Sequence, residues 1–152
     1  MADKRLIDLY PYQIVDSKPV YLLFKRAKGQ LYHGQWRMIG GKVENDERYW
    51  NAALRELYEE THLTPCKLWT VPSVNTFYEH STDTILQIPA FAAEITADEH
   101  IILDSEHSEY KWFELDQALE NIVWPEQQRL LRLTHTIITS NQILDDWLVD
   151  IS

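Results

Sequence analysis

The segment from Glu47 to Thr61 restricts the fold of this chain more than any other, because its residues fit an amphipathic helix with two unlike faces. Four apolar residues recur at helical spacing and predict a buried stripe: Trp50, Ala53, Leu54 and Leu57. Three glutamates stand at positions i, i+3 and i+4 and therefore share another face: Glu56, Glu59 and Glu60. Asn45 or Asp46 is available as the N-cap. We expect a helix that packs on a core by one face and presents carboxylates on the opposite face.

The three carboxylates repel one another, since like charges at this spacing destabilise a helix. A hard divalent cation such as Mg²⁺, which takes oxygen ligands, would turn this repulsion into attraction. Taken alone, a glutamate-rich face is more often solvated surface, and the pair Gly40-Gly41 before the helix would be an ordinary turn. The pattern by itself therefore leaves two hypotheses, a metal site and a solvated face.

Composition is typical of one globular domain over residues 1–152, because 45% of the residues are hydrophobic. The formal net charge of −10 argues against binding duplex nucleic acid or an anionic membrane by charge alone. The sequence has no apolar run long enough for a membrane span. Cys66 is the only cysteine, which excludes an internal disulfide framework. We therefore expect a cytoplasmic protein.

The remaining segments predict a strand-rich chain. Strands are expected at 12–15, 20–25, 36–39, 68–74, 76–78, 85–95 and 110–113, and the strand at 36–39 is expected to end at the glycine pair. Further helices are expected at 116–121 and at 125–139, where Pro125 suits the first turn. The second of these has an apolar face that fits either the core or a homodimer contact: Leu130, Leu131, Thr134, Ile137 and Ile138. Because strands and helices mix without regular alternation, we expect an α+β fold, a mixed α/β/α sandwich.

The segment from Gly41 to Leu63 resembles the Nudix box, the signature of hydrolases that act on nucleoside diphosphates linked to another group. That pattern is glycine, five residues, glutamate, seven residues, and then Arg-Glu-aliphatic-any-Glu-Glu-any-Gly-aliphatic. The chain matches it at these positions: Gly41, Glu47, Arg55, Glu56, Leu57, Glu59, Glu60 and Leu63. It departs from the pattern at His62, which replaces the second glycine. The resemblance implies the Nudix fold, with a central mixed sheet and the box folded as a loop and a helix.

The resemblance also implies a metal centre of Mg²⁺ or Mn²⁺. Its ligands would be the backbone carbonyl of Gly40 and the carboxylates of Glu56, Glu59 and Glu60. In some members the glutamate at the position of Glu56 also serves as the base. Nudix catalysis often recruits one more carboxylate from outside the box. Glu106 is the candidate for this ligand or for the general base, and Glu79 is a weaker rival. The run from Glu106-His107 to Lys111-Trp112 resembles the end of bacterial dihydroneopterin triphosphate pyrophosphatases, which also act on deoxynucleoside triphosphates.

Other box residues would have a structural role. Arg55 and Glu47 would pair and orient the helix against its loop, and Gly41 would keep the backbone close to the metal. Eight helical residues rise about 12 Å, so Glu47 must lie where the loop folds back. His62 stands where a left-handed residue commonly ends a helix, and we expect it to be a strained cap rather than part of the metal site.

Substrate contacts are expected from residues near the box. Arg26 and Arg37 would meet phosphates. Trp36 would stack on a base or pterin ring, with packing against the core as the alternative. Tyr78 lies at a position beyond the box where it resembles a tyrosine of dinucleoside polyphosphate hydrolases, although packing is again the alternative.

The resemblance therefore implies Mg²⁺-dependent hydrolysis of a phosphoanhydride bond in a nucleoside or pterin triphosphate, giving a monophosphate and pyrophosphate. A dinucleoside polyphosphate hydrolase is the first alternative. A non-catalytic Nudix-fold binding or regulatory module is the second, although such members usually lose box carboxylates and this chain retains them. The expected partner is a nucleotide or pterin polyphosphate, which an acidic protein binds when metal ions stand between carboxylates and phosphates.

Overall fold

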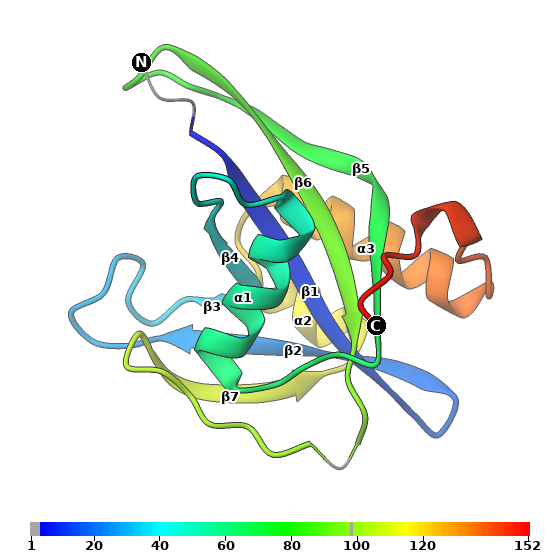
Figure 1. The fold of residues 1–152 in the computed structure, drawn as a ribbon. Helices are drawn as coiled ribbons and strands as arrows, with labels where there is room; N and C mark the ends of the chain where they lie inside the picture. The colour runs from blue at the N-terminus through cyan, green and yellow to red at the C-terminus, as the bar shows by residue number, and fades with distance from the viewer. Residues whose placement is uncertain (1–3, 98) are drawn as a thin grey trace.

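The structure, a computed structural model, describes residues 4–97 and 99–152 of the chain (Figure 1). These residues form one seven-stranded sheet, three α-helices and a short 3₁₀ helix. The elements follow one another in this order: β1 Leu6–Val15, β2 Lys18–Arg26, β3 Trp36–Arg37, β4 Ile39–Lys42, α1 Tyr49–Thr61, β5 Lys67–Glu79, β6 Thr84–Glu94, β7 His107–Phe113, α2 Leu115–Asn121, α3 Pro125–Thr139 and η1 Asp145–Trp147.

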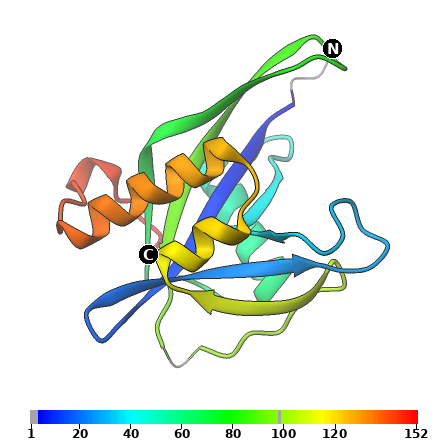
Figure 2. The same ribbon diagram turned by 180° about the vertical axis from the view of Figure 1, so that it is seen from behind.

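The sheet is mixed, and β1 lies at its centre. β1 pairs antiparallel with β2 and β4 and parallel with β6. The order along the main path is β3-β2-β1-β6-β5, and β7 pairs with β2. The helix α1 covers one face of the sheet, whereas α2 and α3 cover the other (Figure 1, Figure 2). The expected α+β sandwich with a central mixed sheet is therefore confirmed.

Two hydrophobic clusters fill the layers on either side of the sheet, because side chains alternate along β1. Ile7 and Leu9 belong to the cluster under α1, together with Leu57 of that helix. Tyr10 and Tyr12 belong to the cluster under α3. The apolar face of α3 contributes three buried residues to this second cluster: Leu130, Leu131 and Ile137. That face is therefore core packing, and not the homodimer contact that the sequence left open.

The helix α1 begins later than the sequence predicted. Its first residue is Tyr49 rather than Glu47, and its N-cap is Arg48, which makes no side-chain cap hydrogen bond. Neither Asn45 nor Asp46 caps the helix, because both lie in the loop that leads from β4 to α1. The shift places Glu47 outside the helix, where its side chain is free to turn back along it.

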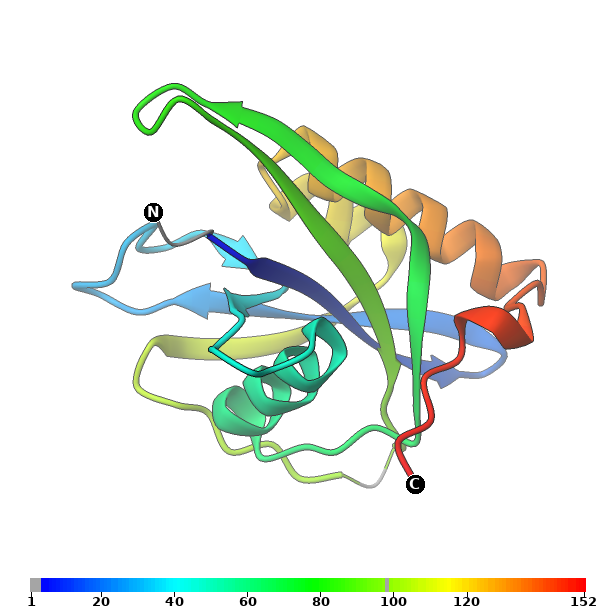
Figure 3. The ribbon, with the colours of Figure 1, turned by 45° about the horizontal axis from the view of Figure 1, so that its top comes forward.

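The strands β5 and β6 form a long hairpin whose tip extends beyond the helices (Figure 3). The two segments predicted at 68–74 and 76–78 are parts of the single strand β5, which is irregular between Thr70 and Val74. None of the helices in the described residues is both long enough and apolar enough to span a membrane.

Candidate active site

The adjacent glycines lie inside β4, where they continue a strand instead of ending it in a turn as the sequence suggested. Gly40 pairs with Asp8 and Gly41 pairs with Ile7 of β1. A Cβ atom at Gly41 would overlap the side chain of Glu56, whereas a Cβ atom at Gly40 would make only ordinary contacts with β1. Any larger residue at 41 would therefore displace the Glu56 side chain, which fills the space between α1 and the strand.

Arg55 joins the loop before α1 to the helix itself. Its Nε and Nη2 atoms donate to the two carboxylate oxygens of Glu47 at 2.8 and 3.0 Å. Its remaining hydrogen bonds reach the carbonyl of Lys42 at 2.7 Å, Glu56 at 2.9 Å and Glu59 at 3.2 Å. The bidentate pair raises the pKa of Arg55 and lowers the pKa of Glu47. The structure thus contains the Arg55–Glu47 pair that the resemblance implied.

Glu60 is buried, with only 5% of its surface exposed, although the sequence placed it on an open carboxylate face. Burial raises the pKa of Glu60 to about 9, and the charges of Glu56, Asp104 and Glu106 contribute to the rise. Its Oε1 atom lies 3.5 Å from Nε2 of His107. Its Oε2 atom is buried and has no hydrogen-bond partner among the described residues. A buried, ionised carboxylate oxygen without a partner is unfavourable, and either a proton or a bound cation relieves this cost.

The segment between β6 and β7 buries Glu60, because it docks on the last turn of α1. The N–H group of Asp104 donates to the carbonyl of Glu60 at 3.3 Å, and that of Ile102 donates to the carbonyl of Thr61 at 3.0 Å. Asp104 Oδ1 also lies 2.8 Å from Nδ1 of His107, whose other ring nitrogen faces Glu60. Asp104 and His107 therefore hold Glu60 through both its backbone and its side chain.

The oxygen-rich cluster around Glu60 fits a hard divalent cation. Burial also raises the pKa of Glu56, and the charges of Glu59 and Glu106 act in the same direction, against the lowering effect of Arg55. Three side chains each offer one ligand atom within 4.8 Å of the others: Glu60, Asp104 and His107. Carboxylates that are gathered to bind a divalent cation repel one another when no cation balances their negative charge. The unpartnered Oε2 atom of Glu60 and the raised pKa values of Glu56 and Glu60 agree with such a site.

Glu106 lies beside this cluster, where the sequence suggested an additional carboxylate. Its side chain is half exposed, and one of its carboxylate oxygens is 3.4 Å from Nη1 of Arg26. Its backbone carbonyl accepts a hydrogen bond from the N–H group of Ala27 at 2.8 Å, which fixes the loop against the end of β2. Glu106 is therefore held near the cluster while its carboxylate remains accessible to solvent.

A cavity of about 740 Å³ opens beside the carboxylates and is large enough for a nucleotide. Its lining includes both glycines of β4 and four polar side chains near the carboxylates: Arg26, Arg37, Glu106 and His107. Two aromatic residues form another wall, where the rings of Tyr32 and Trp124 meet edge to face at 5.8 Å. The Arg37 guanidinium lies over the Tyr32 ring, 4.6 Å from its centre. The cavity thus combines cationic groups with an aromatic surface.

Of the substrate contacts predicted from sequence, Arg26 and Arg37 line this cavity, but Trp36 is not among its lining residues. The Trp36 ring packs edge to face on Phe113 at 5.3 Å, beside the core cluster under α3. The structure therefore places Trp36 in core packing. Trp124, which the sequence reasoning missed, is the tryptophan that lines the cavity.

Tyr78 also lies away from the cavity. Phe77 and Glu79 line it, and Tyr78 between them faces the other side because side chains alternate along β5. The Tyr78 hydroxyl donates to Asp83 at 2.7 Å on an exposed surface. Glu79, the rival to Glu106, accepts a hydrogen bond from Lys4 at 3.4 Å.

Three buried polar side chains, one each from β1, β5 and α3, line the cavity: Asp8, Asn75 and Gln127. We call this group the polar floor. The sequence did not indicate that these three residues lie together. Asn75 Nδ2 donates to Asp8 Oδ2 at 3.0 Å, and Gln127 Nε2 lies 3.5 Å from both Asp8 oxygens. Burial raises the pKa of Asp8, and the two amides oppose that shift. The available signal was Asp8 itself, the one charged residue in the strand LIDLYPYQIV.

His62 ends α1 in the left-handed conformation, with φ of 63° and ψ of 17°. Its N–H group donates to the carbonyl of Tyr58 at 2.7 Å, and its ring stacks on the Tyr58 ring with centres 5.2 Å apart. The helix end therefore keeps the geometry that the box glycine would give, and stacking compensates part of the strain. His62 is a cap, as expected, and its ring packs on Tyr58.

We predict that His62→Gly raises the free energy of unfolding by up to about 1 kcal/mol, because glycine adopts positive φ without strain. Turnover should remain unchanged, since the ring of His62 stacks on Tyr58 and contacts no carboxylate of the cluster. Thermal and urea unfolding, with kcat measured in parallel, would check both statements. A large loss of kcat with a stable fold would contradict this assignment of His62.

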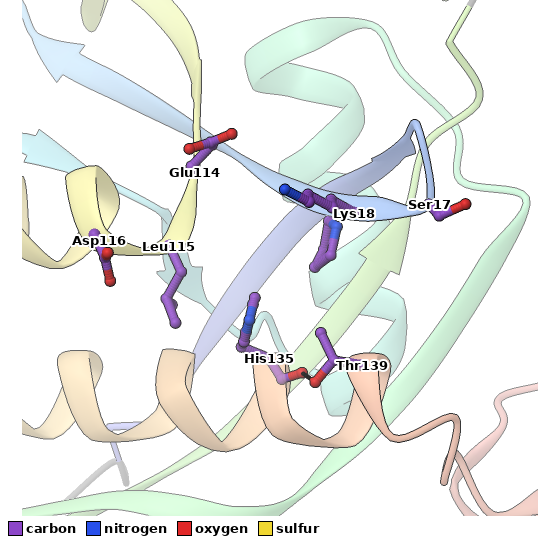
Figure 4. A pocket seen from close by; sticks show the side chains of 8 residues that line it. Ser17, Lys18, Glu114, Leu115, Asp116, His135 and Thr139 are labelled. Atoms are coloured by element: carbon purple, nitrogen blue, oxygen red, sulfur yellow. Dashed lines mark hydrogen bonds between the residues drawn. The ribbon is translucent and has the colours of Figure 1, made fainter.

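A second and smaller cavity of about 360 Å³ lies between the β1–β2 turn and the helices α2 and α3 (Figure 4). Its lining mixes one lysine with two carboxylates and a histidine: Lys18, Glu114, Asp116 and His135. His135 Nδ1 lies 2.8 Å from the Tyr21 hydroxyl, which ties α3 to β2. This cavity shares no lining residue with the larger one and is not part of the carboxylate site.

Comparison with known proteins agrees with this geometry. Nucleoside triphosphatase NudI of Klebsiella pneumoniae (strain 342) is 29% identical over 107 residues, which are 65% of this chain and 76% of that protein. An Ap4A hydrolase binary complex from C. elegans superposes with a TM-score of 0.75 and 23% identity, covering 91% of this chain and 99% of that one. The NUDIX domain of Shewanella oneidensis NrtR, complexed with ADP ribose, has a TM-score of 0.72 and 19% identity, covering 90% and 88%. These two structural likenesses show the shared fold.

The family model described as NUDIX domain matches residues 13–134, which is most of the chain. The matched range contains the glycine strand, the glutamate helix and the segment that carries Glu106. The protein therefore belongs to the Nudix family of hydrolases.

Proposed function

We propose that the protein hydrolyses a phosphoanhydride bond of a nucleoside triphosphate, or of a related pterin triphosphate, and releases a monophosphate and pyrophosphate. The observation that carries the proposal is the buried, unpartnered Oε2 atom of Glu60 beside a cavity that Arg26 and Arg37 line. A substrate that consists of a polyphosphate with a bound metal ion needs carboxylates for the metal and guanidinium groups for the phosphates, and this site has both.

The metal ligands in this proposal are the carbonyl of Gly40 and three carboxylates, Glu56, Glu59 and Glu60, and Glu106 is assigned as the general base rather than as a further ligand. A bound Mg²⁺ or Mn²⁺ ion lowers the pKa of a water molecule and neutralises charge on a phosphoryl group. Glu106 would accept the proton of the attacking water, since its carboxylate is half exposed at the cavity wall. Arg55 would keep two of the ligands in place through its hydrogen bonds to Glu56 and Glu59.

The rest of the substrate would occupy the cavity. Arg26 and Arg37 would bind phosphate oxygens, and the Tyr32–Trp124 wall would contact the ring system. The name of the NudI relative, nucleoside triphosphatase, supports this substrate class. A dinucleoside polyphosphate is the alternative suggested by the structural likeness to Ap4A hydrolase. The tyrosine that pointed to this alternative, Tyr78, is outside the cavity lining, which favours the triphosphate.

A substrate panel with and without Mg²⁺ tests the proposal. We expect release of pyrophosphate from nucleoside triphosphates or dihydroneopterin triphosphate, and much slower turnover of diadenosine polyphosphates and ADP-ribose. A clear preference for diadenosine polyphosphates would replace the substrate assignment by the alternative. Absence of metal-dependent hydrolysis across the whole panel would favour a binding module, which the retained carboxylates argue against.

A further inference from the structure

The polar floor consists of the side chains of Asp8, Asn75 and Gln127, which come from three elements far apart in the sequence. Each is nearly inaccessible to solvent, with exposed fractions of 5%, 6% and 5%, yet all three line the large cavity. The proposed metal and phosphate chemistry uses none of them. Buried polar side chains that line a binding cavity and have no part in phosphate binding are candidates for reading the rest of the ligand.

The hydrogen-bonding capacity that the floor leaves unused consists of acceptors. The amide donors of Asn75 and Gln127 are directed at the Asp8 carboxylate. The amide oxygen of Gln127, Oε1, is buried and has no hydrogen-bond partner among the described residues. The Asp8 oxygens keep further lone pairs, since a carboxylate has about four acceptor positions. A ligand that brings two neighbouring N–H donors would satisfy both groups at once.

Heterocyclic rings differ in the donors that they place side by side. Guanine has a ring N–H next to an exocyclic amino group, and a pterin ring carries the same 2-amino-oxo edge. In adenine and cytosine the amino group stands next to a ring nitrogen that is an acceptor. In uracil and thymine one N–H stands between two carbonyl groups. Only the 2-amino-oxo edge offers adjacent donors to the two acceptors of the floor.

The position of the floor suits a ring attached to a polyphosphate. Asp8 stands opposite Gly40 in the register of β1 and β4. The floor is therefore next to the strand that carries the proposed metal ligand Gly40, where the phosphates would bind. Trp124 comes directly before α3, and Gln127 lies in the first turn of that helix. Trp124 of the aromatic wall and Gln127 of the floor are therefore held together at the start of the same helix.

We infer that Asp8 and Gln127, supported by Asn75, select substrates whose ring carries the 2-amino-oxo edge, as in guanine nucleotides and pterin triphosphates. This inference rests on the proposed function, which it deepens by naming the part of the substrate that is recognised. The selectivity is a property of this chain's cavity floor and is separate from the carboxylates that carry out hydrolysis.

The test compares pairs of substrates that differ in one donor. GTP should be hydrolysed with a kcat/KM about tenfold or more above that of ITP, which lacks only the 2-amino group, and well above that of ATP and UTP. Comparison of kcat/KM for dihydroneopterin triphosphate and for GTP in the same assay shows whether the preferred ring is a pterin or a guanine. Equal kcat/KM values for GTP and ITP would overturn the inference while leaving the proposed hydrolase function intact.

Two variants locate the effect. Asp8→Asn replaces an acceptor by a donor. Gln127→Met removes the unpartnered oxygen and also the Nε2 donor that lies 3.5 Å from both Asp8 oxygens, so both variants alter the acceptors of the floor. Both should bring the GTP to ITP ratio close to one. The matched control is Glu126→Gln, which neutralises a carboxylate that lines the same cavity and pairs with Arg129, and should leave the ratio unchanged. A retained ratio in Gln127→Met, with an unchanged melting curve, contradicts the assignment.

A binding measurement separates this inference from the hydrolase proposal. Calorimetric titration of the metal-free protein with GMP and IMP requires no hydrolysis. We expect GMP to bind more tightly than IMP, and Gln127→Met to remove the difference. Tighter binding of GMP than of IMP, without turnover of any triphosphate, would support ring selection by the floor and refute the proposed hydrolysis. Turnover of triphosphates with equal binding of GMP and IMP would support the hydrolysis and refute ring selection by the floor.

Discussion

Glu60→Gln should reduce kcat by about a thousandfold or more while the protein stays folded, because a metal ligand contributes several kcal/mol to stabilising charge in the transition state. Glutamine keeps the shape of the side chain and its contact with His107, but it removes the anionic oxygen that the proposed cation needs. Steady-state hydrolysis at saturating Mg²⁺, with Mn²⁺ affinity measured separately, would check the loss and its cause. The matched control is Glu120→Gln, an exposed glutamate on α2 across the sheet.

The same substitution should change how stability depends on pH in the metal-free protein. Burial raises the pKa of Glu60 to about 9 in the folded state, above its ordinary value of 4.5. The folded state therefore holds this proton more tightly than the unfolded state, and stability falls as pH rises from about 4.5 to about 9. Glutamine cannot ionise, so Glu60→Gln should flatten the decline, and Mg²⁺ should stabilise only the parent protein strongly. Undiminished turnover and an unchanged pH profile would remove Glu60 from the metal site.

Gly41→Ala should lower kcat by about a hundredfold, because the new methyl group would occupy the space of the Glu56 side chain. Glu56 would have to move, and Arg55 would lose the geometry in which it contacts Glu47 and Glu56 together. The fold should survive, since Gly41 does not need a positive φ and the backbone can accept alanine. Kinetics and a Mn²⁺ titration would show the loss in both activity and metal affinity.

Gly40→Ala is the matched comparison for this prediction. A Cβ atom there would lie 3.6 Å from the carbonyl oxygen of Ile7 and 3.7 Å from Asp8 Oδ1, which are ordinary contacts. The carbonyl of residue 40 would be retained, so the loss should be clearly smaller than in Gly41→Ala. Equal losses in the two variants would mean that close packing on Glu56 is not the reason for the glycine at 41.

The order of elements and the carboxylate helix were predictable because their signals are local. Pro125 begins α3 as expected, and the resemblance to the Nudix box implied the Arg55–Glu47 pair that the structure contains. The prediction that a strand ends in a turn at the glycine pair was wrong, since a glycine in a turn and a glycine under a close side chain look alike in sequence. Only the approach of α1 to β4 distinguishes the two cases.

Features that depend on distant segments were not predictable in the same way. The burial of Glu60 comes from the segment before β7, more than forty positions away, whose docking no local pattern announces. The sequence suggested Trp36 as a ring contact and did not single out Trp124, whereas the fold places Trp36 in core packing and Trp124 in the cavity wall. The polar floor is assembled from three elements whose side chains are polar singly and form a site only together.

The span of the polar floor bears on the order in which the protein folds. Arg55 and Glu47 are 8 positions apart, whereas Asp8 and Gln127 are 119 apart. Contacts between near neighbours form quickly, and those that close a long loop form late because the chain entropy must be lost first. We therefore expect the Arg55–Glu47 pair to form earlier in folding than the contact between Asp8 and Gln127. A chain that is still being synthesised and lacks α3 would also lack Gln127, and with it one side of the polar floor.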